Sequence, residues 1–163
     1  MPRRSVKENK TIYQLSRERA GLTREAAAER MEFVTASRIE KIESERSAPH
    51  PEEILAMAAA YADPMLRNAF CTQACPIGEK YVPRAQAKSI SQITLDMVVT
   101  LNDLMRDRDR LMEITADGTV SSEEQEDFRA IRENLDRMSS VIESLRLWVD
   151  GAAGEDGKGR SML

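Results

Sequence analysis

Seven regularly spaced apolar residues in the last third of the chain restrict the possible folds most strongly. The distance in sequence from each of these residues to the next alternates between three and four positions. The run consists of Phe128, Ile131, Leu135, Met138, Ile142, Leu145 and Val149. An α-helix completes a turn in about 3.6 residues, so this spacing places the apolar side chains in one row along a helix. A row kept through successive heptads is typical of a coiled-coil helix, which needs a partner helix.

The segment 89–113 supplies that partner. Its apolar residues also recur at helical spacing, and they are Ile90, Ile93, Met97, Leu101, Leu104 and Leu111. Asp117 and Gly118 favour a turn after this segment, and Ser122 with Gln125 fits a capping box at the start of the next helix. The sequence therefore predicts a long antiparallel helical hairpin with coiled-coil-like packing.

A second apolar row is left outside that seam. It consists of Met105, Met112, Val141 and Trp148. Exposed apolar surface of that extent usually meets a partner. We therefore expect residues 89–150 to form a dimerisation or regulatory module, and we expect a homodimer to form through the hairpin.

The composition favours helices throughout the chain. Aromatic residues make up only 4% of it, whereas hydrophobic residues make up 41% and charged residues 32%. Ala, Leu, Ile, Met, Glu and Arg dominate, a balance that favours helix over strand. The sequence contains no run of 18 apolar residues, so we expect no membrane span. The basic N-terminal residues are not followed by an apolar stretch, so we expect no secretory signal. With two cysteines, we expect an all-α protein in the reducing cytoplasm, without membrane contact.

Capping signals divide the first half of the chain into five short helices. Gly21 suits the end of the first helix, and Thr23 suits the start of the second. Pro51 fits the first turn of the fourth helix, and Pro64 the opening of the fifth, which ends near Cys75. The threonine and glycine signals help to satisfy backbone groups that a helix end leaves unpaired, and a proline in the first turn has no N–H to leave unpaired.

Composition sets the expected boundaries. Residues 76–88 contain two prolines and Gly78, which indicates a linker. Residues 151–163 are Gly-rich and polar, which indicates a disordered tail. The expected organisation is a helical domain at residues 1–75, the linker, the hairpin at residues 89–150 and the tail.

Three segments within residues 10–62 carry a family resemblance. They are Leu15-Ser16-Arg17-Glu18-Arg19-Ala20-Gly21-Leu22-Thr23 with Ala27-Ala28-Glu29-Arg30-Met31, then Arg38-Ile39-Glu40-Lys41-Ile42-Glu43, and then Pro49-His50-Pro51-Glu52-Glu53-Ile54-Leu55-Ala56-Met57-Ala58. In order and approximate spacing they resemble the Cro/C1 (XRE) family of helix-turn-helix transcriptional regulators. The resemblance implies a five-helix, repressor-like domain that binds double-stranded DNA. It also implies an ion pair between Arg17 and Glu43 that ties the first helix to the third.

The resemblance also indicates which residues would contact DNA. The third helix, at about residues 35–43, would enter the major groove with its N-terminus first. Its candidate base readers, off the apolar stripe, are Thr35, Ala36, Ser37, Arg38 and Lys41. Candidate phosphate contacts are Arg3, Arg4, Lys7, Lys10, Arg24 and Arg46. We therefore expect a dimeric, sequence-specific, DNA-binding transcriptional regulator.

The distribution of charge leaves an alternative open. Residues 1–49 carry a net charge of +3 and the rest of the chain carries −7, which suits an anion-binding head on an acidic body. The third helix nevertheless contains Glu40 and Glu43, with Glu45 just after it, and carboxylates repel phosphates. The alternative is a protein-interaction adaptor that keeps the helix-turn-helix fold without binding DNA.

Cys71 and Cys75 suggest a third alternative, a redox or metal sensor. Four residues apart on a helix, they share one face, but a closed zinc site needs four ligands and the only histidine is His50. A dimer could pool four cysteines, or the two could form a disulfide, although such residues are more often small apolar members of a core. We expect no metal and no cofactor. Because no catalytic constellation is present, we expect no enzyme activity.

Overall fold

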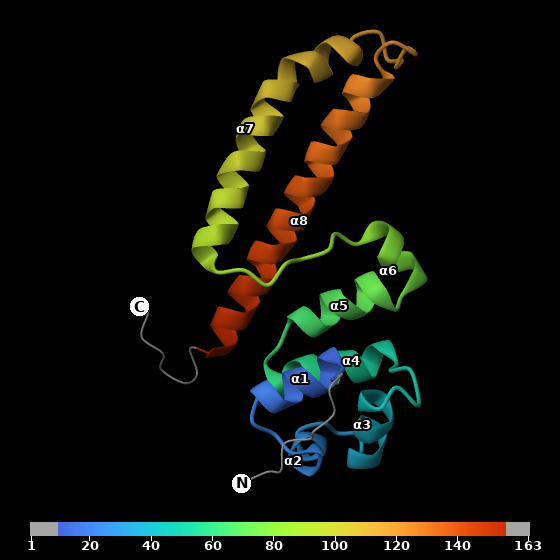
Figure 1. Ribbon diagram of the computed structural model, residues 1–163, viewed down its shortest axis with the longest axis vertical. Coiled ribbons are helices and arrows are strands. Elements are labelled where there is room, and N and C mark those ends of the chain that lie inside the picture. The colour runs from blue at the N-terminus through green and yellow to red at the C-terminus, as the bar shows by residue number, and fades with distance from the viewer. Residues whose placement is uncertain (1–9, 156–163) are drawn as a thin grey trace. The chain divides into compact units, whose positions relative to one another are not determined.

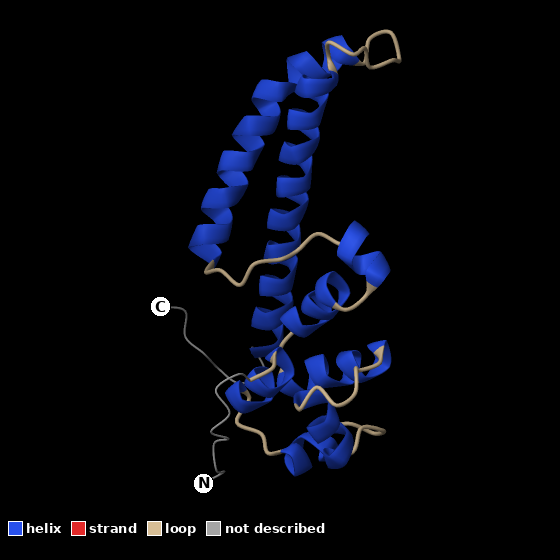
Figure 2. Ribbon diagram, turned by 45° about the vertical axis from the view of Figure 1, so that its right-hand side comes forward, coloured by secondary structure: helices blue, strands red, loops and turns tan. Residues whose placement is uncertain are grey.

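The computed structural model describes residues 10–155, and every regular element in that range is a helix (Figures 1 and 2). The described residues form two compact units, one made of residues 10–82 with 150–155 and the other of residues 83–149. The expected all-α class is confirmed, because short N-terminal helices are followed by a hairpin of two long ones. Within residues 10–155, no helix combines the length and the apolar character needed to cross a membrane.

Five short helices open the N-terminal unit. They are α1 (Ile12–Arg19), α2 (Arg24–Glu29), α3 (Ala36–Glu43), α4 (Pro51–Tyr61) and α5 (Met65–Gln73). The side-chain oxygens of Thr11, Thr23 and Thr35 each accept a hydrogen bond from the backbone N–H three residues further on, which satisfies a donor that the helix start leaves unpaired. After α1, Gly21 has a φ of 70°, a conformation that glycine adopts at little cost. Local signals therefore account for these helices.

The core of this unit is made mainly of aliphatic side chains. Ile39 and Ile42 of α3, together with Ile54 and Met57 of α4, are at most 2% exposed, and Ala27 of α2 is completely buried. Residues three apart lie on the same side of a helix, so α3 and α4 each bury one side. The opposite side of α3 is consequently left to face solvent.

A sixth helix, α6 (Pro76–Tyr81), occupies the first half of the segment that the sequence analysis interpreted as a linker. Cys75 caps it, because the Cys75 Sγ atom accepts a hydrogen bond from the backbone N–H of Gly78 at 3.5 Å. Pro76 stands at the first helical position, where its missing N–H costs nothing. The linker interpretation is therefore wrong for residues 76–81, because a proline at that position begins a helix as readily as it interrupts one.

Gly78→Ala is expected to lower the free energy of unfolding by roughly 1–3 kcal/mol, the usual cost of overpacking. A Cβ atom on Gly78 would lie 2.2 Å from the backbone carbonyl oxygen of Cys71, and a backbone atom yields less easily than a side chain. Urea denaturation of the full chain measures the effect. The matched variant is Ala74→Gly, an exposed position four residues earlier at the end of α5, and a larger loss there would contradict the packing argument.

The second unit is a hairpin. Its helices α7 (Ile90–Ile114) and α8 (Gln125–Glu155) run antiparallel and lie side by side (Figure 1). Between them, Asn134 Nδ2 donates to Asp107 Oδ2 at 2.6 Å, and the Thr100 hydroxyl lies 3.7 Å from the sulfur of Met138. These contacts join successive turns of the two helices, as the predicted hairpin requires.

The turn before α8 differs from the expectation by one residue. The backbone N–H and the hydroxyl of Ser121 both donate to Glu124 Oε2, at 3.0 and 2.7 Å. The expected capping pair was Ser122 with Gln125, but the carboxylate of Glu124 accepts both hydrogen bonds from Ser121 instead. Helix α8 then begins at Gln125.

The apolar row predicted for α8 divides into two. Ile131 and Met138 are buried and Leu145 is half-buried, whereas the four members of the row spaced seven residues apart remain 37–51% exposed. Val141, which was expected to lie outside the seam, is buried as well, so that expectation is wrong. The exposed residues are Phe128, Leu135, Ile142 and Val149. The prediction that all seven residues face α7 is therefore wrong. One position of the seam that does face α7 is Asn134, which is polar, so an apolar pattern does not reveal it.

Helix α8 also extends further than predicted. It continues to Glu155, so residues 151–155 are helical where the sequence analysis expected a disordered tail. The segment contains two alanines, the best helix formers, but its two glycines are poor ones, so helix propensity alone does not account for the extension. Within the N-terminal unit, Arg67 Nη2 donates to Asp150 Oδ2 at 2.6 Å. The rest of the expected tail, residues 156–163, lies outside the described residues.

Candidate DNA-binding surface

The outward side of α3 carries a small set of polar residues. Thr35 caps the helix, and Thr35, Ser37 and Lys41 are exposed while Ala36 is half-buried. Ser37 and Lys41 are four residues apart, so they lie on the same side of the helix, away from Ile39 and Ile42. This is where the sequence analysis expected base readers.

Arg38 occupies a different position from these residues. Its guanidinium binds the carboxylate of Glu53 in α4 with two hydrogen bonds, of 2.6 and 2.7 Å, and also donates to the hydroxyl of Ser47 and the carbonyl of Ala48. Glu53 in turn accepts from the backbone N–H of His50 at 2.8 Å, which caps α4. Arg38 therefore joins α3 to the start of α4, and its donors are not directed at the outward surface.

This pair shifts the titration of both partners. The hydrogen bond from Arg38 lowers the pKa of Glu53, with the His50 N–H acting in the same direction. The hydrogen bond to Glu53 raises the pKa of Arg38. Paired hydrogen bonds between guanidinium and carboxylate are among the stronger polar contacts in proteins, so the Arg38–Glu53 pair fixes the loop between α3 and α4.

Arg38→Ala is expected to lower the free energy of unfolding by about 1.5–3 kcal/mol. Because Arg38 lowers the pKa of Glu53, the contribution of the pair is present above the ordinary glutamate pKa of about 4.3 and is lost as the pH falls through the folded-state pKa. The variant should therefore lose less stability than the parent between about pH 5 and pH 3. Denaturation at a series of pH values measures both effects, and parallel pH curves would contradict the assignment.

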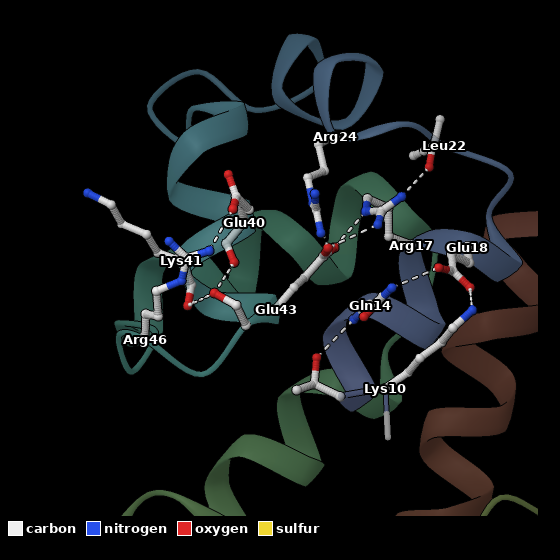
Figure 3. A network of polar contacts seen from close by, with 12 residues as sticks. Lys10, Gln14, Arg17, Glu18, Leu22, Arg24, Glu40, Lys41, Glu43 and Arg46 are labelled. Carbon is white, nitrogen blue, oxygen red and sulfur yellow. Dashed lines mark hydrogen bonds and ion pairs between the residues drawn. The ribbon is translucent and has the colours of Figure 1, made fainter. Parts of the chain in front are cut away.

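The structure brings Arg17 and Glu43 together in the interior (Figure 3). Arg17 donates to the two carboxylate oxygens at 2.6 and 3.0 Å and to the carbonyl of Leu22 at 2.6 Å. Burial by itself lowers the pKa of Arg17, but the hydrogen bond and charge of Glu43 outweigh burial and raise it. Arg24 adds a third donor, with its Nε atom 2.8 Å from Glu43 Oε2. Glu43 is thus shared by α1, α2 and α3.

The remaining charges near α3 are exposed. Arg46 Nη2 donates to Glu40 Oε1 at 2.8 Å, and both side chains are largely in solvent. Lys41 extends away from the protein (Figure 3), and no ion pair within residues 10–155 involves it. Among the other expected phosphate contacts, Lys10 is paired with Glu18 at 2.6 Å. Arg3, Arg4 and Lys7 lie outside the described residues.

Two features of this surface were missed by the sequence analysis. The Arg38–Glu53 pair had one available signal, since a glutamate in the first turn of α4 fits a capping box, but its partner is 15 residues away. Phe33, in the turn between α2 and α3, is 60% exposed. An aromatic residue in a turn carries no periodic pattern, so nothing in the sequence indicated its exposure.

The geometry of α2, the turn and α3 can be compared with known families. Residues 14–67 match the family model of a helix-turn-helix domain. The match runs from α1 into α5 and includes every residue of α2, α3 and α4. No curated protein and no solved structure matches the chain. The chain therefore contains a helix-turn-helix domain, a fold that typically binds DNA and carries no enzyme activity.

Cys71 and Cys75 are free thiols, both partly buried. Cys71 belongs to α5 and Cys75 is the residue that caps α6. Among the described residues, no group of three or more histidine, cysteine or acidic side chains is placed to hold a metal ion. The hydrogen bond from Gly78 to Cys75 gives this thiol a structural role.

Proposed function

We propose that this protein is a sequence-specific, DNA-binding transcriptional regulator of the Cro/C1 (XRE) type. The observation that carries the proposal is the outward side of α3, where Ser37 and Lys41 face solvent within a matched helix-turn-helix domain. In such domains the second helix of the motif lies in the major groove and contacts base edges with residues near its N-terminus. A DNA partner also fits the expected location in the cytoplasm.

The expected DNA contacts can be assigned from the exposure of each side chain and from the hydrogen-bond donors that the protein does not already use. Thr35 and Ser37 are the candidates for base edges, with Ala36 available for apolar contact with a thymine methyl group. Lys41 is the exposed cation of α3. Arg46 and Arg24 are the candidates for phosphate contacts. Arg46 is held only by a weak surface pair with Glu40. The Arg24 side chain is 36% exposed although its Nε atom bonds Glu43. Arg38 has the different task of positioning α3.

The pairing of the acidic residues favours DNA binding over the adaptor alternative. Glu43 is 2% exposed and holds two arginines, and Glu40 is paired with Arg46. Glu45 is the third glutamate whose charge argued against phosphate binding. It is exposed, and no ion pair among the described residues involves it. The repulsion expected from Glu43 is therefore compensated in the interior, whereas Glu40 is paired only weakly at the surface.

Lys41→Ala is expected to weaken DNA binding without changing stability. Loss of one cation should lower the slope of log affinity against log salt by roughly one unit, and loss of a base contact should cost about 1–3 kcal/mol of specific binding. Glu40→Lys should act in the opposite direction, because it removes a carboxylate and releases Arg46. Fluorescence anisotropy with genomic DNA around the protein's own gene measures both.

Lys80→Ala is the matched control, an exposed lysine of α6 outside the matched domain, and it should leave affinity unchanged. A parent protein that binds no genomic fragment at about 50 mM salt, where electrostatic affinity is much stronger than at physiological salt, would exclude the proposal. The protein-interaction adaptor would then be the better explanation.

We further propose that the hairpin, residues 89–150, makes the protein a homodimer. The support is the heptad row of α8 that α7 does not cover, Phe128, Leu135, Ile142 and Val149. On α7, Leu101, Met105 and Met112 are also 48–66% exposed. Since isologous contacts between two copies generate two-fold symmetry, a dimer would present two α3 helices to the two halves of a palindromic site.

A further inference from the structure

The hairpin unit contains a cavity of about 410 Å³. Its floor is formed by Ile93, Thr100 and Val141, which are at most 9% exposed, and its walls include Leu95 and Val99. A water molecule takes up about 30 Å³ in the liquid, so this volume corresponds to roughly a dozen water-sized groups. The cavity lies in the lower range of small-molecule sites, which are typically apolar with a few polar groups at the edge.

The polar groups on the floor are already bonded within the helices. The Thr100 hydroxyl donates to the carbonyl of Asp96 at 2.8 Å, and the Ser144 hydroxyl donates to the carbonyl of Ser140 at 2.7 Å. The Ser144 oxygen also accepts from the backbone N–H of Gln86 at 2.9 Å. The floor therefore offers an occupant mainly apolar contact.

Of the two cationic side chains at the edge of the cavity, one is only weakly paired. Lys88 is paired with Asp96 at 2.6 Å. Arg137 reaches Asp103 only through Nη1 at 3.3 Å, and its side chain is 57% exposed. Asp103 is also bonded by Arg106, so this carboxylate keeps a partner if Arg137 turns away from it. Arg137 is consequently free to bind an incoming anion with its remaining donors.

We infer that this cavity is a binding site for a small monocarboxylate with an apolar body, which lies on the Ile93–Val141 floor and places its carboxylate on Arg137. A guanidinium binds a carboxylate with two parallel hydrogen bonds. The segment 83–89, which precedes α7, supplies Gln86 and Lys88 to the wall. The occupant would thus contact the segment immediately before α7 as well as the two helices. This site is independent of the proposed DNA contact.

Octanoate is a suitable probe, since its ten non-hydrogen atoms fit the cavity, and 1-octanol is its uncharged counterpart. Calorimetry with the full chain is expected to show saturable binding of one octanoate per chain. Arg137→Gln should weaken octanoate binding by about tenfold or more and leave octanol binding unchanged. The matched control is Arg132→Gln, an exposed arginine of α8 that does not line the cavity, and it should leave both unchanged.

A second variant separates the cavity from apolar surface elsewhere. Ser140 lines the cavity and is only half-buried, so Ser140→Phe should fill the space and abolish binding of both probes while the helical circular dichroism spectrum is retained. Absence of saturable octanoate binding to the parent would overturn the inference. Equal losses in Arg137→Gln and Arg132→Gln would also overturn it, and these two positions are exposed enough to test it even if Ser140→Phe fails to fold.

Discussion

Glu43→Ala is expected to lower the free energy of unfolding by about 3–5 kcal/mol, the usual cost of removing one partner from a buried ion pair. The Glu43 side chain is 1% exposed and the Arg17 side chain 9%, so the variant leaves the Arg17 guanidinium buried without its carboxylate. Arg17 would keep only the carbonyl of Leu22. Since natural domains are stable by about 5–15 kcal/mol, this change alone should remove much of the stability of the N-terminal unit.

Two comparisons make this prediction specific. Glu40→Ala breaks a pair whose side chains are 65% and 46% exposed, and should change stability by no more than about 0.5 kcal/mol. Arg17→Met combined with Glu43→Leu replaces the buried charges by apolar groups and should recover most of the loss. Arg24, 36% exposed, can turn towards solvent in that variant. Urea denaturation giving similar losses for Glu43→Ala and Glu40→Ala would contradict this account.

The elements that could be predicted from the sequence are those that depend on neighbouring residues. A threonine before α2 and α3 determines where each helix begins, because it bonds a backbone N–H only three residues away. The burial of Ile39 and Ile42 follows from their spacing on α3. The outward position of Lys41 follows from the same periodicity.

The features that escaped prediction depend on distant partners. Arg38 was expected to read bases, but which side chain it contacts depends on Glu53 and on the loop that returns α4 to α3. Spacing within one helix contains no information about that contact. The same holds for α8, where the position of α7 determines which of two neighbouring rows is covered. The half-buried polar residue Asn134 belongs to the covered row.

The apolar row that α7 leaves uncovered is where we expect a substitution to change dimer formation most. We call the exposed apolar residues Leu101, Met105, Met112, Phe128, Leu135 and Ile142 the open face of the hairpin. The contacts of Arg137 with Asp103 and of Asn134 with Asp107, like the cavity, lie on the other flank of both helices. Helical spacing therefore places the exposed rows of α7 and α8 together on one side. A second copy would bury both rows in a four-helix arrangement.

Leu135→Glu is expected to raise the dimer dissociation constant by about a hundredfold or more, because each chain would bring an unpaired carboxylate into the apolar interface, at a cost of several kcal/mol for the two. Val99→Glu is the matched control, since Val99 is 48% exposed, Leu135 is 46% exposed, and Val99 lines the cavity on the opposite flank. Sedimentation velocity at tens of micromolar should show a dimeric parent, a dimeric Val99→Glu variant and a monomeric Leu135→Glu variant.

A parent that is monomeric at that concentration, or a dimer that survives Leu135→Glu, would exclude the open face as the dimer interface. A dimer lost in Val99→Glu but not in Leu135→Glu would place the interface on the cavity side, where two copies would compete with the proposed carboxylate ligand.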